Sequence, residues 1–413
     1  MSETSLKSTD DGLPTGARLT SLDEDYREHL HEVLDDLREK APAHRDPEFH
    51  HVFLTRHDDV KAVLKDRDMF VDPRTTLPDD YVRFFVSDAD SADYEPSILF
   101  LDDPDHRRLR GIVSQAFNPR SVEAMRPRIE AIAAELLDAM EGEDEVDLIT
   151  AYAAPLPTMV IADMLGVALE RRADFKRWSD DIVQVFDPLR TPETTARMEA
   201  SQQAMRAFFT DVIAERRVKP GDDLISGLIR AEEEGARLTN REVLSMCTLL
   251  LTAGNVTTTD LIGNGMFALL GHPRELERLK AGPGLIVNAV EEMLRYDSPV
   301  TDSGRHALKD VEIGGCPIEK GRSLTVSLAA ANHDPAIYPD PHKFDIIRAD
   351  THNQSFGGGV HMCLGAPLAR LEAQIAINAL LARFPAIAPW SRKPVRRHLP
   401  AFRGFEHLTA RLK

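Results

Sequence analysis

Apolar residues recur at helical spacing along most of the chain, so the pattern predicts a largely helical protein. Periodicity of this kind predicts helices over residues 23–40, 57–65, 104–117, 119–140, 155–166, 170–186, 193–217, 223–234 and 284–296. Strand-like patterns are short and few, at residues 50–55, 305–314 and 323–328 and in the tail after Pro394. We therefore predict a mainly α protein with small β-sheets.

The longest predicted helix runs from Thr239 to Leu270. Thr239 and Glu242 have the spacing of a capping box at its start, and from Leu249 onward the sequence is apolar on nearly all sides, which predicts a place in the core. Its middle, residues 253–260 (AGNVTTTD), is small and polar for a buried helix. Glycine there costs about 1 kcal/mol, and threonine hydroxyls compete for backbone carbonyls and bend helices. Two interpretations stay open, a kinked groove beside a bound group or tight helix–helix packing.

Residues 70–101 lack a regular pattern and contain three prolines, which predicts a long, partly mobile loop of the kind that often gates a pocket. The first 20 residues are polar and rich in Ser, Thr and Asp, which predicts a flexible N-terminal arm. No linker-like composition interrupts the remainder. Residues 21–413 are therefore predicted to form a single catalytic domain.

Composition narrows the class of protein. The 413 residues are 42% hydrophobic, enough for a large core, and the net charge of −18 argues against a general nucleic-acid binder. The three cysteines, Cys247, Cys316 and Cys363, lie far apart, which argues against a disulfide framework or a cysteine-rich metal cluster. The N-terminus has no signal-peptide pattern, and no apolar run approaches the roughly 18 residues of a membrane span. We expect a soluble, cytoplasmic protein.

The stretch from Phe356 to Gly365 (FGGGVHMCLG) carries the candidate chemistry. Its glycines allow the backbone to bend tightly and approach a flat group closely. A helix is predicted from Leu364 to about Phe384, so the N–H groups at its start would stabilise a thiolate at Cys363. A lone cysteine is more often a small buried hydrophobe, but chance occurrence of the whole pattern is on the order of 10⁻⁵. A thiolate ligand for a flat metal cofactor such as heme is the resulting hypothesis.

From about residue 20 to the C-terminus the chain resembles the cytochromes P450 of the soluble bacterial kind, which are heme-thiolate monooxygenases with a helical bundle enclosing the heme. Five separated motifs carry the resemblance: the cysteine loop, Glu292-x-x-Arg295 with Arg348, the pair His106 and Arg110, Arg305, and the long helix. The resemblance implies heme b (iron protoporphyrin IX) with Cys363 as axial thiolate and metal ligand. It further implies a cofactor-binding set of His106, Arg110, Arg305, Phe356, His361, Cys363 and Gly365, in which Phe356 packs beside the sulfur and the basic residues meet the propionates. Glu292, Arg295 and Arg348 would form a buried structural bridge.

On the long helix the resemblance implies an oxygen-binding site. Ala253 and Gly254 would leave room for O₂, and Thr257 would hydrogen-bond it and its protons. The position before Thr257 usually carries an acid, and here it is Val256, which cannot relay protons. Asn255 or water could substitute, Asp260 one turn on could serve, or proton delivery could be slow. We favour a relay of water and hydroxyl groups.

The implied activity is hydroxylation, or another oxidation, of a small hydrophobic organic substrate with O₂ and two electrons. No dinucleotide-binding fingerprint occurs in the chain, so the electrons are expected from a separate ferredoxin and its NAD(P)H reductase. A basic patch of Arg107, Arg108 and Arg370 is the predicted docking surface. Val256 keeps open a peroxide-driven enzyme as an alternative, and a non-enzymatic heme protein that binds a ligand is a third possibility.

The substrate pocket is expected to take residues from 70–101, 180–195, 249–257, 300–304 and 400–405. The apolar candidates within these ranges are Phe84, Phe85, Phe186, Leu250, Val300 and Phe402. Arg83 or Arg190 could anchor a carboxylate, although an arginine at the surface is the simpler interpretation of both.

Overall fold

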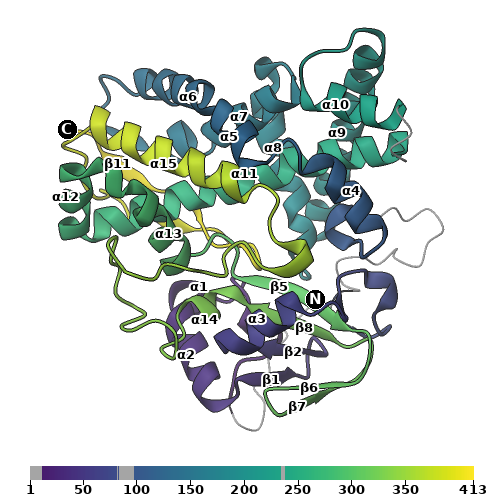
Figure 1. Ribbon diagram of the computed structural model, residues 1–413. Coiled ribbons are helices and arrows are strands. Elements are labelled where there is room, and N and C mark those ends of the chain that lie inside the picture. The colour runs from purple at the N-terminus through teal and green to yellow at the C-terminus, as the bar shows by residue number, and fades with distance from the viewer. Residues whose placement is uncertain (1–11, 81, 83–96, 234–237) are drawn as a thin grey trace.

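A computed structural model describes residues 12–80, 82, 97–233 and 238–413. Figure 1 shows a large helical part, which contains α6, α7, α9, α11 and α15, and a smaller part in which α1, α2, α3 and α14 lie beside a β-sheet. The helices are α1 (Glu24–Glu28), α2 (Leu30–Lys40), α3 (His57–Lys65), α4 (Asp105–Val113), α5 (Pro119–Ala124), α6 (Arg126–Ala139), α7 (Pro155–Leu165), α8 (Arg172–Ile182), α9 (Pro192–Val218), α10 (Leu224–Glu233), α11 (Asn240–Gly271), α12 (Pro273–Ala281), α13 (Ile286–Tyr296), α14 (Leu328–Asn332) and α15 (Ala366–Arg383). The prediction of a mainly α protein with small sheets is confirmed.

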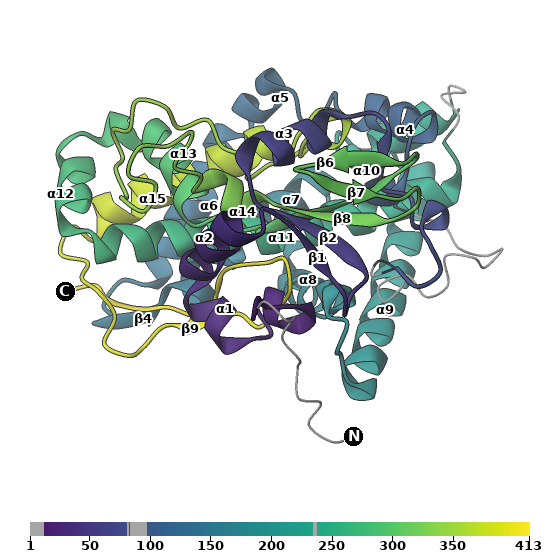
Figure 2. The ribbon, with the colours of Figure 1, turned by 90° about the horizontal axis from the view of Figure 1, so that it is seen from below.

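The main sheet has five strands in the order β1-β2-β8-β5-β3. Its members are β1 (Ala43–Asp46), β2 (His51–Leu54), β3 (Met69–Phe70), β5 (Asp302–Ala307) and β8 (Ser323–Ser327). Strands β2 and β8 pair in parallel, while the other neighbours are antiparallel. Helix α3 packs on β8, and α14 joins α2 and α3 (Figure 2), so apolar side chains of α3 and the sheet form one buried cluster. Two-stranded pairings of β6 (Val311–Ile313) with β7 (Cys316–Ile318), β9 (Val395–Arg396) with β10 (Phe405–His407), and β4 (Glu145–Asp147) with β11 (Thr409–Arg411) complete the strands.

Helix α11 runs unbroken through the main core. The predicted capping box is confirmed, because Thr239 Oγ1 accepts the N–H of Glu242 at 3.2 Å and Glu242 Oε2 accepts the N–H of Thr239 at 2.7 Å. Arg108 of α4 donates to the same Glu242 at 2.5 Å, which joins α4 to the start of α11. At Gly265 a Cβ would lie 2.7 Å from the sulfur of Met293, so the missing side chain allows α13 to approach closely.

Several predicted boundaries are wrong. The single helix expected over 23–40 is broken at His29, the one over 119–140 at Met125, and the one over 104–117 ends at Val113. The strand expected over 305–314 divides into β5 and β6, and the helix after the cysteine starts at Ala366. Strand β1 and helices α12 and α14 were not predicted. The helices α3, α7 and α9 were predicted to within a residue.

The N-terminal segment is more ordered than predicted in the part that the structure describes. Residues Gly16–Leu19 form a 3₁₀ turn, and Leu13 and Leu19 are buried in a cluster with α2. Residues 13–19 therefore belong to the packed structure, not to a flexible arm. No helix in the described ranges is long and apolar enough to cross a membrane.

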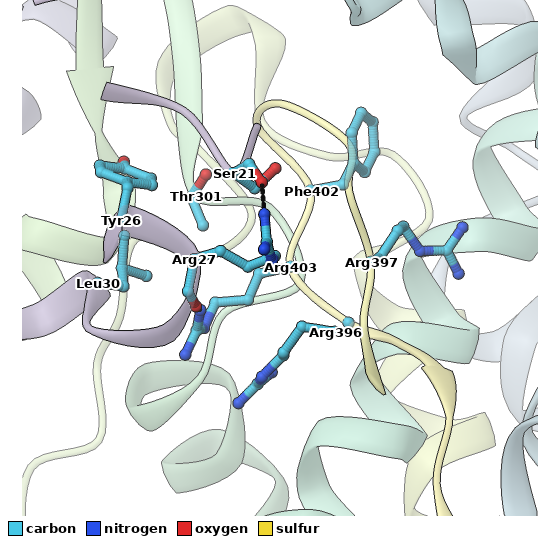
Figure 3. A pocket seen from close by; sticks show the side chains of 10 residues that line it. Ser21, Tyr26, Arg27, Leu30, Thr301, Arg396, Arg397, Phe402 and Arg403 are labelled. Carbon is cyan, nitrogen blue, oxygen red and sulfur yellow. Dashed lines mark hydrogen bonds between the residues drawn. The ribbon is translucent and has the colours of Figure 1, made fainter. Parts of the chain in front are cut away.

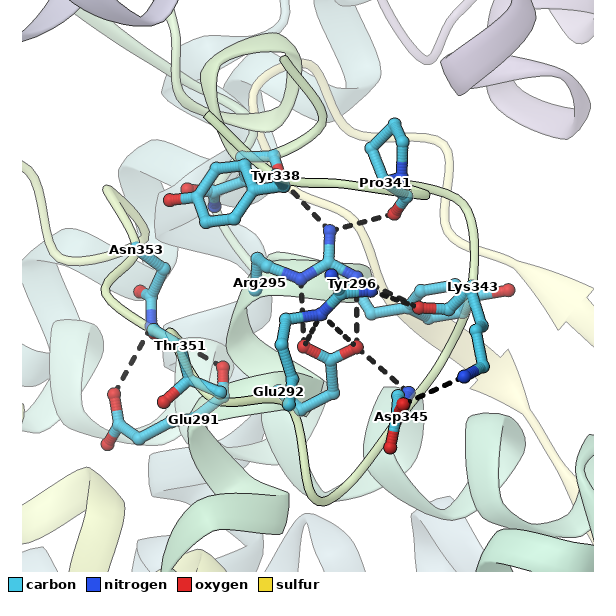
Figure 4. A network of polar contacts seen from close by, with 12 residues as sticks. Glu291, Glu292, Arg295, Tyr296, Tyr338, Pro341, Lys343, Asp345, Thr351 and Asn353 are labelled. Atoms are coloured by element: carbon cyan, nitrogen blue, oxygen red, sulfur yellow. Dashed lines mark hydrogen bonds and ion pairs between the residues drawn. The ribbon is translucent and has the colours of Figure 1, made fainter. Parts of the chain in front are cut away.

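A buried ionic network holds the segment that leads to the cysteine loop (Figure 4). The guanidinium of Arg295 forms two hydrogen bonds to the carboxylate of Glu292, at 2.8 and 2.9 Å, and both side chains are fully buried. Arg348 adds a contact of 3.1 Å to the same carboxylate, so the predicted bridge of three residues is confirmed. The remaining donors of Arg295 go to carbonyls of Asn332 and Pro341. Every charge in this network has partners that offset its desolvation.

The network continues to the cysteine loop through Asn332 and Ser355. The amide of Asn332 donates to Ser355 Oγ at 2.9 Å, and its oxygen accepts the N–H of Gln354 at 2.7 Å. Ser355 Oγ in turn donates to the carbonyl of Leu294 on α13 at 2.7 Å. The residue just before Phe356 is thereby fixed to the helix that carries the ion pair.

Substitution Glu292→Ala should cost about 3–5 kcal/mol, because it leaves two guanidinium groups buried without a carboxylate. We expect a large fall in the free energy of unfolding, measured by urea denaturation, together with lower soluble yield. The matched control is Glu277→Ala, which removes an exposed pair with Lys280 and should change stability far less. Equal stability of the two variants would contradict the assigned role of the network.

Candidate functional site

The cysteine loop is closed on itself and pressed against α3. The N–H of Cys363 donates to the carbonyl of Phe356 at 2.9 Å, at the base of the loop. Gly359 has φ +65°, and a Cβ there would lie 2.1 Å from the carbonyl oxygen of Leu64. Gly357 also has positive φ but meets nothing within 4 Å. The expectation that the glycines face a flat group is therefore wrong for Gly359, which faces the end of α3.

Cys363 is exposed and lies three residues before the first residue of α15. Desolvation by surrounding protein atoms raises the pKa of its thiol, while the N–H groups of Gly365 and Ala366 and the charges of Arg110 and Arg370 oppose that rise. The predicted help from the helix start is present, but burial outweighs it. A metal ion would remove the proton directly, because a coordinated thiol ionises.

His106 and Arg110 of α4 lie against the cysteine loop, which itself contributes His361. The rings of His106 and His361 have centroids 4.2 Å apart, and Arg110 donates to the carbonyl of Met362 at 2.5 Å. Burial, with smaller effects from the charges of His361 and Arg110, lowers the pKa of His106 to about 4. Residues that α4 and the cysteine loop contribute separately are thus brought together, while their binding of the propionates stays a prediction.

Arg305, on β5, is a buried cation without a carboxylate partner among the described residues. It is 5% exposed and donates to Ser303 Oγ at 2.9 Å and to the carbonyl of Gly304 at 2.6 Å. Burial lowers its pKa to about 10, against a smaller opposing effect from Asp102. A buried guanidinium that bonds only to neutral oxygens is suited to an anionic partner.

Asp102 connects these residues and was missed by the sequence analysis. Its carboxylate accepts the N–H groups of Val71 and Asp72 at 3.1 and 3.0 Å and lies 3.5 Å from Nε2 of His361. That contact lacks hydrogen-bond alignment, and Nε2 of His361 is buried without another partner in the described chain. No motif distinguishes Asp102 from its acidic neighbours in the sequence.

On α11 one helix face is open while the rest is buried. Ala253 is exposed and Gly254 and Thr257 are half-buried, whereas Val256 is buried and Asn255 is fully buried. Asn255 lies about 160–200° around the helix from Ala253 and Thr257, so its side chain points away from that face. Thr257 Oγ1 donates to the carbonyl of Ala253 at 2.9 Å.

These residues fit a heme. Cys363 offers one exposed sulfur for an axial bond. Arg305, which has no carboxylate partner among the described residues, and His361, whose buried Nε2 has only the 3.5 Å contact with Asp102, suit the propionates. Of the two interpretations left open for the middle of α11, the kink is absent, because the helix is continuous, and its small residues leave one face open.

Comparisons with known proteins agree with this geometry. The family model described as Cytochrome P450 matches residues 14–281 and 285–402. The polyketide biosynthesis cytochrome P450 PksS of Bacillus subtilis (strain 168) is 40% identical over 371 residues, covering 86% of this chain and 90% of that protein. The 6-deoxyerythronolide B hydroxylase of Saccharopolyspora erythraea is 41% identical over 367 residues, covering 87% and 89%.

Solved structures show the same fold. The crystal structure of myxobacterial cytochrome P450 CYP267B1 in complex with myristic acid is 38% identical, with a TM-score of 0.89, covering 96% of this chain and 99% of that one. P450BioI in complex with an acyl carrier protein ligated to hexadec-9Z-enoic acid is 35% identical, with a TM-score of 0.87, covering 94% and 100%. The chain therefore belongs to the cytochrome P450 family, and it is a monooxygenase that carries heme b on a cysteine thiolate.

Proposed function

We propose that Cys363 is the axial thiolate of this cytochrome P450 and that His106, Arg110, Arg305 and His361 hold the heme propionates. The buried guanidinium of Arg305, which has no carboxylate partner in the part of the chain that the structure describes, is the observation that best supports the propionate assignment. Burial lowers the pKa of His106 to about 4, an anionic propionate beside the ring would act in the opposite direction, and we assign His106 a ring N–H that donates to the propionate.

Two further residues of the loop support the thiolate. The N–H of Gly365 lowers the pKa of Cys363, and we assign it a hydrogen bond to the ligated sulfur. Phe356 lies under the guanidinium of Arg370, which is 4.4 Å from its ring centroid. Its ring is proposed to shield the sulfur from water.

The proposed substrate is a small hydrophobic organic molecule. Phe402 lies next to two other pocket residues named from the sequence. Its ring is 5.4 Å from that of Phe186, and its backbone pairs with that of Val300. Phe402 also packs against a buried cluster that includes Val256. Myristic acid in CYP267B1 and testosterone in CYP109E1 of Bacillus megaterium are hydrophobic ligands of related proteins.

Other pocket candidates take no part in this apolar group. Leu250 packs in the main core, and Arg190 donates to the carbonyls of Asp187 and Val185 at 3.0 and 3.4 Å, which holds its own turn. Phe84, Phe85 and Arg83 lie outside the described residues. The apolar lining of Phe186, Val300 and Phe402 thus carries the substrate proposal without a carboxylate anchor.

When bound, heme supplies the redox chemistry that activates O₂. The chain's own residues then have three tasks at α11. Ala253 and Gly254 keep side-chain volume away from the open face, while Thr257 uses the lone pairs left free by its bond to Ala253 to accept a hydrogen bond from water. Asn255 has no role in this proposal, because it is fully buried on the opposite side of the helix.

We further propose that the two electrons come from a separate ferredoxin and its NAD(P)H reductase. The docking patch expected from the sequence needs revision, because each of its arginines is paired. Arg107 pairs with Asp103, Arg108 with Glu242, and Arg370 with Glu291. These arginines offer a ferredoxin less net charge than their number suggests. Arg107, 73% exposed, is the one that best reaches a partner.

The monooxygenase function is tested by turnover with ferredoxin, reductase, NAD(P)H and isotopically labelled O₂ on a panel of apolar compounds that shift the heme spectrum. We expect a product that carries one labelled oxygen atom, measured by mass spectrometry, and no product without reductase. Product formed with peroxide alone and not with O₂ would instead support the peroxide-driven alternative. Ligand binding without any product would support the non-enzymatic one.

Substitution Cys363→Ala should abolish the absorbance band that CO gives with reduced, thiolate-ligated heme. The control is Cys316→Ala, since Cys316 lies in the β6–β7 hairpin, and this variant should keep the band. A normal band in the Cys363 variant would reject the ligand assignment.

Charge reversal Arg107→Glu should slow electron transfer from ferredoxin and weaken its dependence on salt, because it replaces an exposed cation with an anion. Lys393→Glu is the matched control. Lys393 is 81% exposed beside Glu28 of α1, an element distant from α4 in Figure 1. Stopped-flow reduction rates at several salt concentrations measure the effect, and identical profiles for Arg107→Glu and the wild type would contradict the docking site.

A further inference from the structure

Protons have to reach the open face of α11 from outside. Monooxygenation converts a substrate, O₂, two electrons and two protons to a hydroxylated product and water, so each turnover consumes two protons at a buried place. Thr257 stands at that face, and Val256 beside it carries no exchangeable proton. The nearest titratable residue along the same helix is Asp260, three residues beyond Thr257 and four beyond Val256. Side chains at these spacings are neighbours on a helix, with Cβ atoms about 5–6 Å apart.

Asp260 is buried with only one of its two carboxylate oxygens bonded to a described residue. Its exposure is 0%, and Oδ1 lies 3.1 Å from Nη2 of Arg397. A side chain at Gly404 would collide with the same oxygen, since a Cβ there would lie 2.0 Å from it. No described residue bonds to Oδ2. A buried carboxylate oxygen without a partner is costly, which points to a ligand such as water at Oδ2.

Of three neighbouring arginines in the C-terminal segment, only Arg397 pairs with Asp260. Arg396 and Arg403 both pair with Asp297, at 2.9 and 2.5 Å. Figure 3 shows the side chain of Arg397 pointing away from the other two, toward the helices. The C-terminal segment therefore places one guanidinium beside the carboxyl group of Asp260 on α11.

The same guanidinium connects Asp260 to the surface. Arg397 Nη1 lies 3.8 Å from Asp180 Oδ1 on α8, and the Asp180 side chain is 38% exposed and paired with Lys176. These are the charged groups around Asp260: Arg397 from the C-terminal segment and Asp180 and Lys176 from α8. Polar groups thus run from solvent to a carboxyl next to Thr257.

We propose that Asp260 is the proton-relay residue of this enzyme and passes protons from the Asp180 side to a water held by Thr257. It would replace the acid that usually precedes the threonine, a position that is Val256 here. The proposal rests on the monooxygenase function and names the group that serves it. Two hydrogen bonds through one water span about 5.5 Å, which matches the spacing of neighbouring side chains on the helix.

The O–H bond of the Asp260 carboxylic acid breaks, its proton goes to the water at Oδ2, and that water releases one of its own protons toward the open face beside Thr257. The carboxylate left behind is stabilised by Arg397 and regains a proton from solvent through water near Asp180. Burial raises the pKa of Asp260 to about 6, opposed by Arg397 and Lys176, so near neutral pH it can both hold and release a proton.

The first test needs no substrate. Infrared titration of the heme-loaded wild type and of Asp260→Asn should give a difference spectrum with one buried carboxyl band that disappears as pH rises through about 6. The difference cancels the bands of the other buried carboxyls, Asp302 and Glu372, which both proteins keep. A difference spectrum without that band overturns the proposal. Asparagine keeps an oxygen for Arg397, and denaturation curves establish that the variant is folded.

The second test uses a substrate found with labelled O₂ and measures product formed per NAD(P)H and the solvent isotope effect. Asp260→Asn should lower the product yield about tenfold or more and lose the wild-type change in yield near pH 6. Adding Val256→Asp to that variant should restore the yield. An unchanged yield in Asp260→Asn overturns the proposal, and so does a loss that Val256→Asp fails to restore at equal heme content. If the wild type oxidises no compound, the monooxygenase proposal fails, while the infrared titration still decides the role of Asp260.

Discussion

The buried carboxylate of Glu292 is the constraint on which the position of the cysteine depends. Two guanidinium groups contact this fully buried carboxylate, so removing any one of the three groups would leave the others charged in a low dielectric with fewer partners. Because Arg295 also binds the carbonyls of the segment after α14, α13 and that segment are held in one arrangement. Asn332 and Ser355 extend this to the residue before Phe356. An ion pair far from the chemistry in sequence thereby fixes where the sulfur stands.

Helix α11 satisfies two opposed demands. It fills the core along most of its length, with Gly265 admitting α13, yet it exposes Ala253 and Thr257 on one face. Small residues achieve this without a break, because removing side-chain volume opens a surface while the backbone hydrogen bonds stay intact. Threonine bonds to the preceding turn satisfy hydroxyls that would otherwise be buried unpaired.

The sequence predicted what depends on local pattern and on strong motifs. The capping box of α11 follows from residue types at a fixed spacing. The Glu292 bridge follows from the motifs that carry the family resemblance, which also implied that His106 and His361 share a place beside the propionates. The helix breaks at His29 and Met125 could not be predicted, because one residue's backbone angles are set by packing from elsewhere. Helix α12 could have been found from its N-terminal proline and buried leucines. Asp102 could not, since its partners lie thirty residues away in sequence.

The number of arginines around a buried carboxylate decides what that carboxylate can do. Burial raises the pKa of Asp297, but Arg396 and Arg403 together overcome it and hold the pKa below its ordinary value, so Asp297 stays an anion and clamps the C-terminal segment. Asp260 is as deeply buried as Asp297 but has only one close guanidinium, that of Arg397, and the negative charge of Asp180 repels it. The pKa of Asp260 therefore rises. Protonating Asp260 costs little stability, because the proton removes the charge that a second arginine balances at Asp297. The protein thus has one carboxylate that stays charged and is suited to structure, and a second, beside the open face of α11, whose pKa lies near neutral pH.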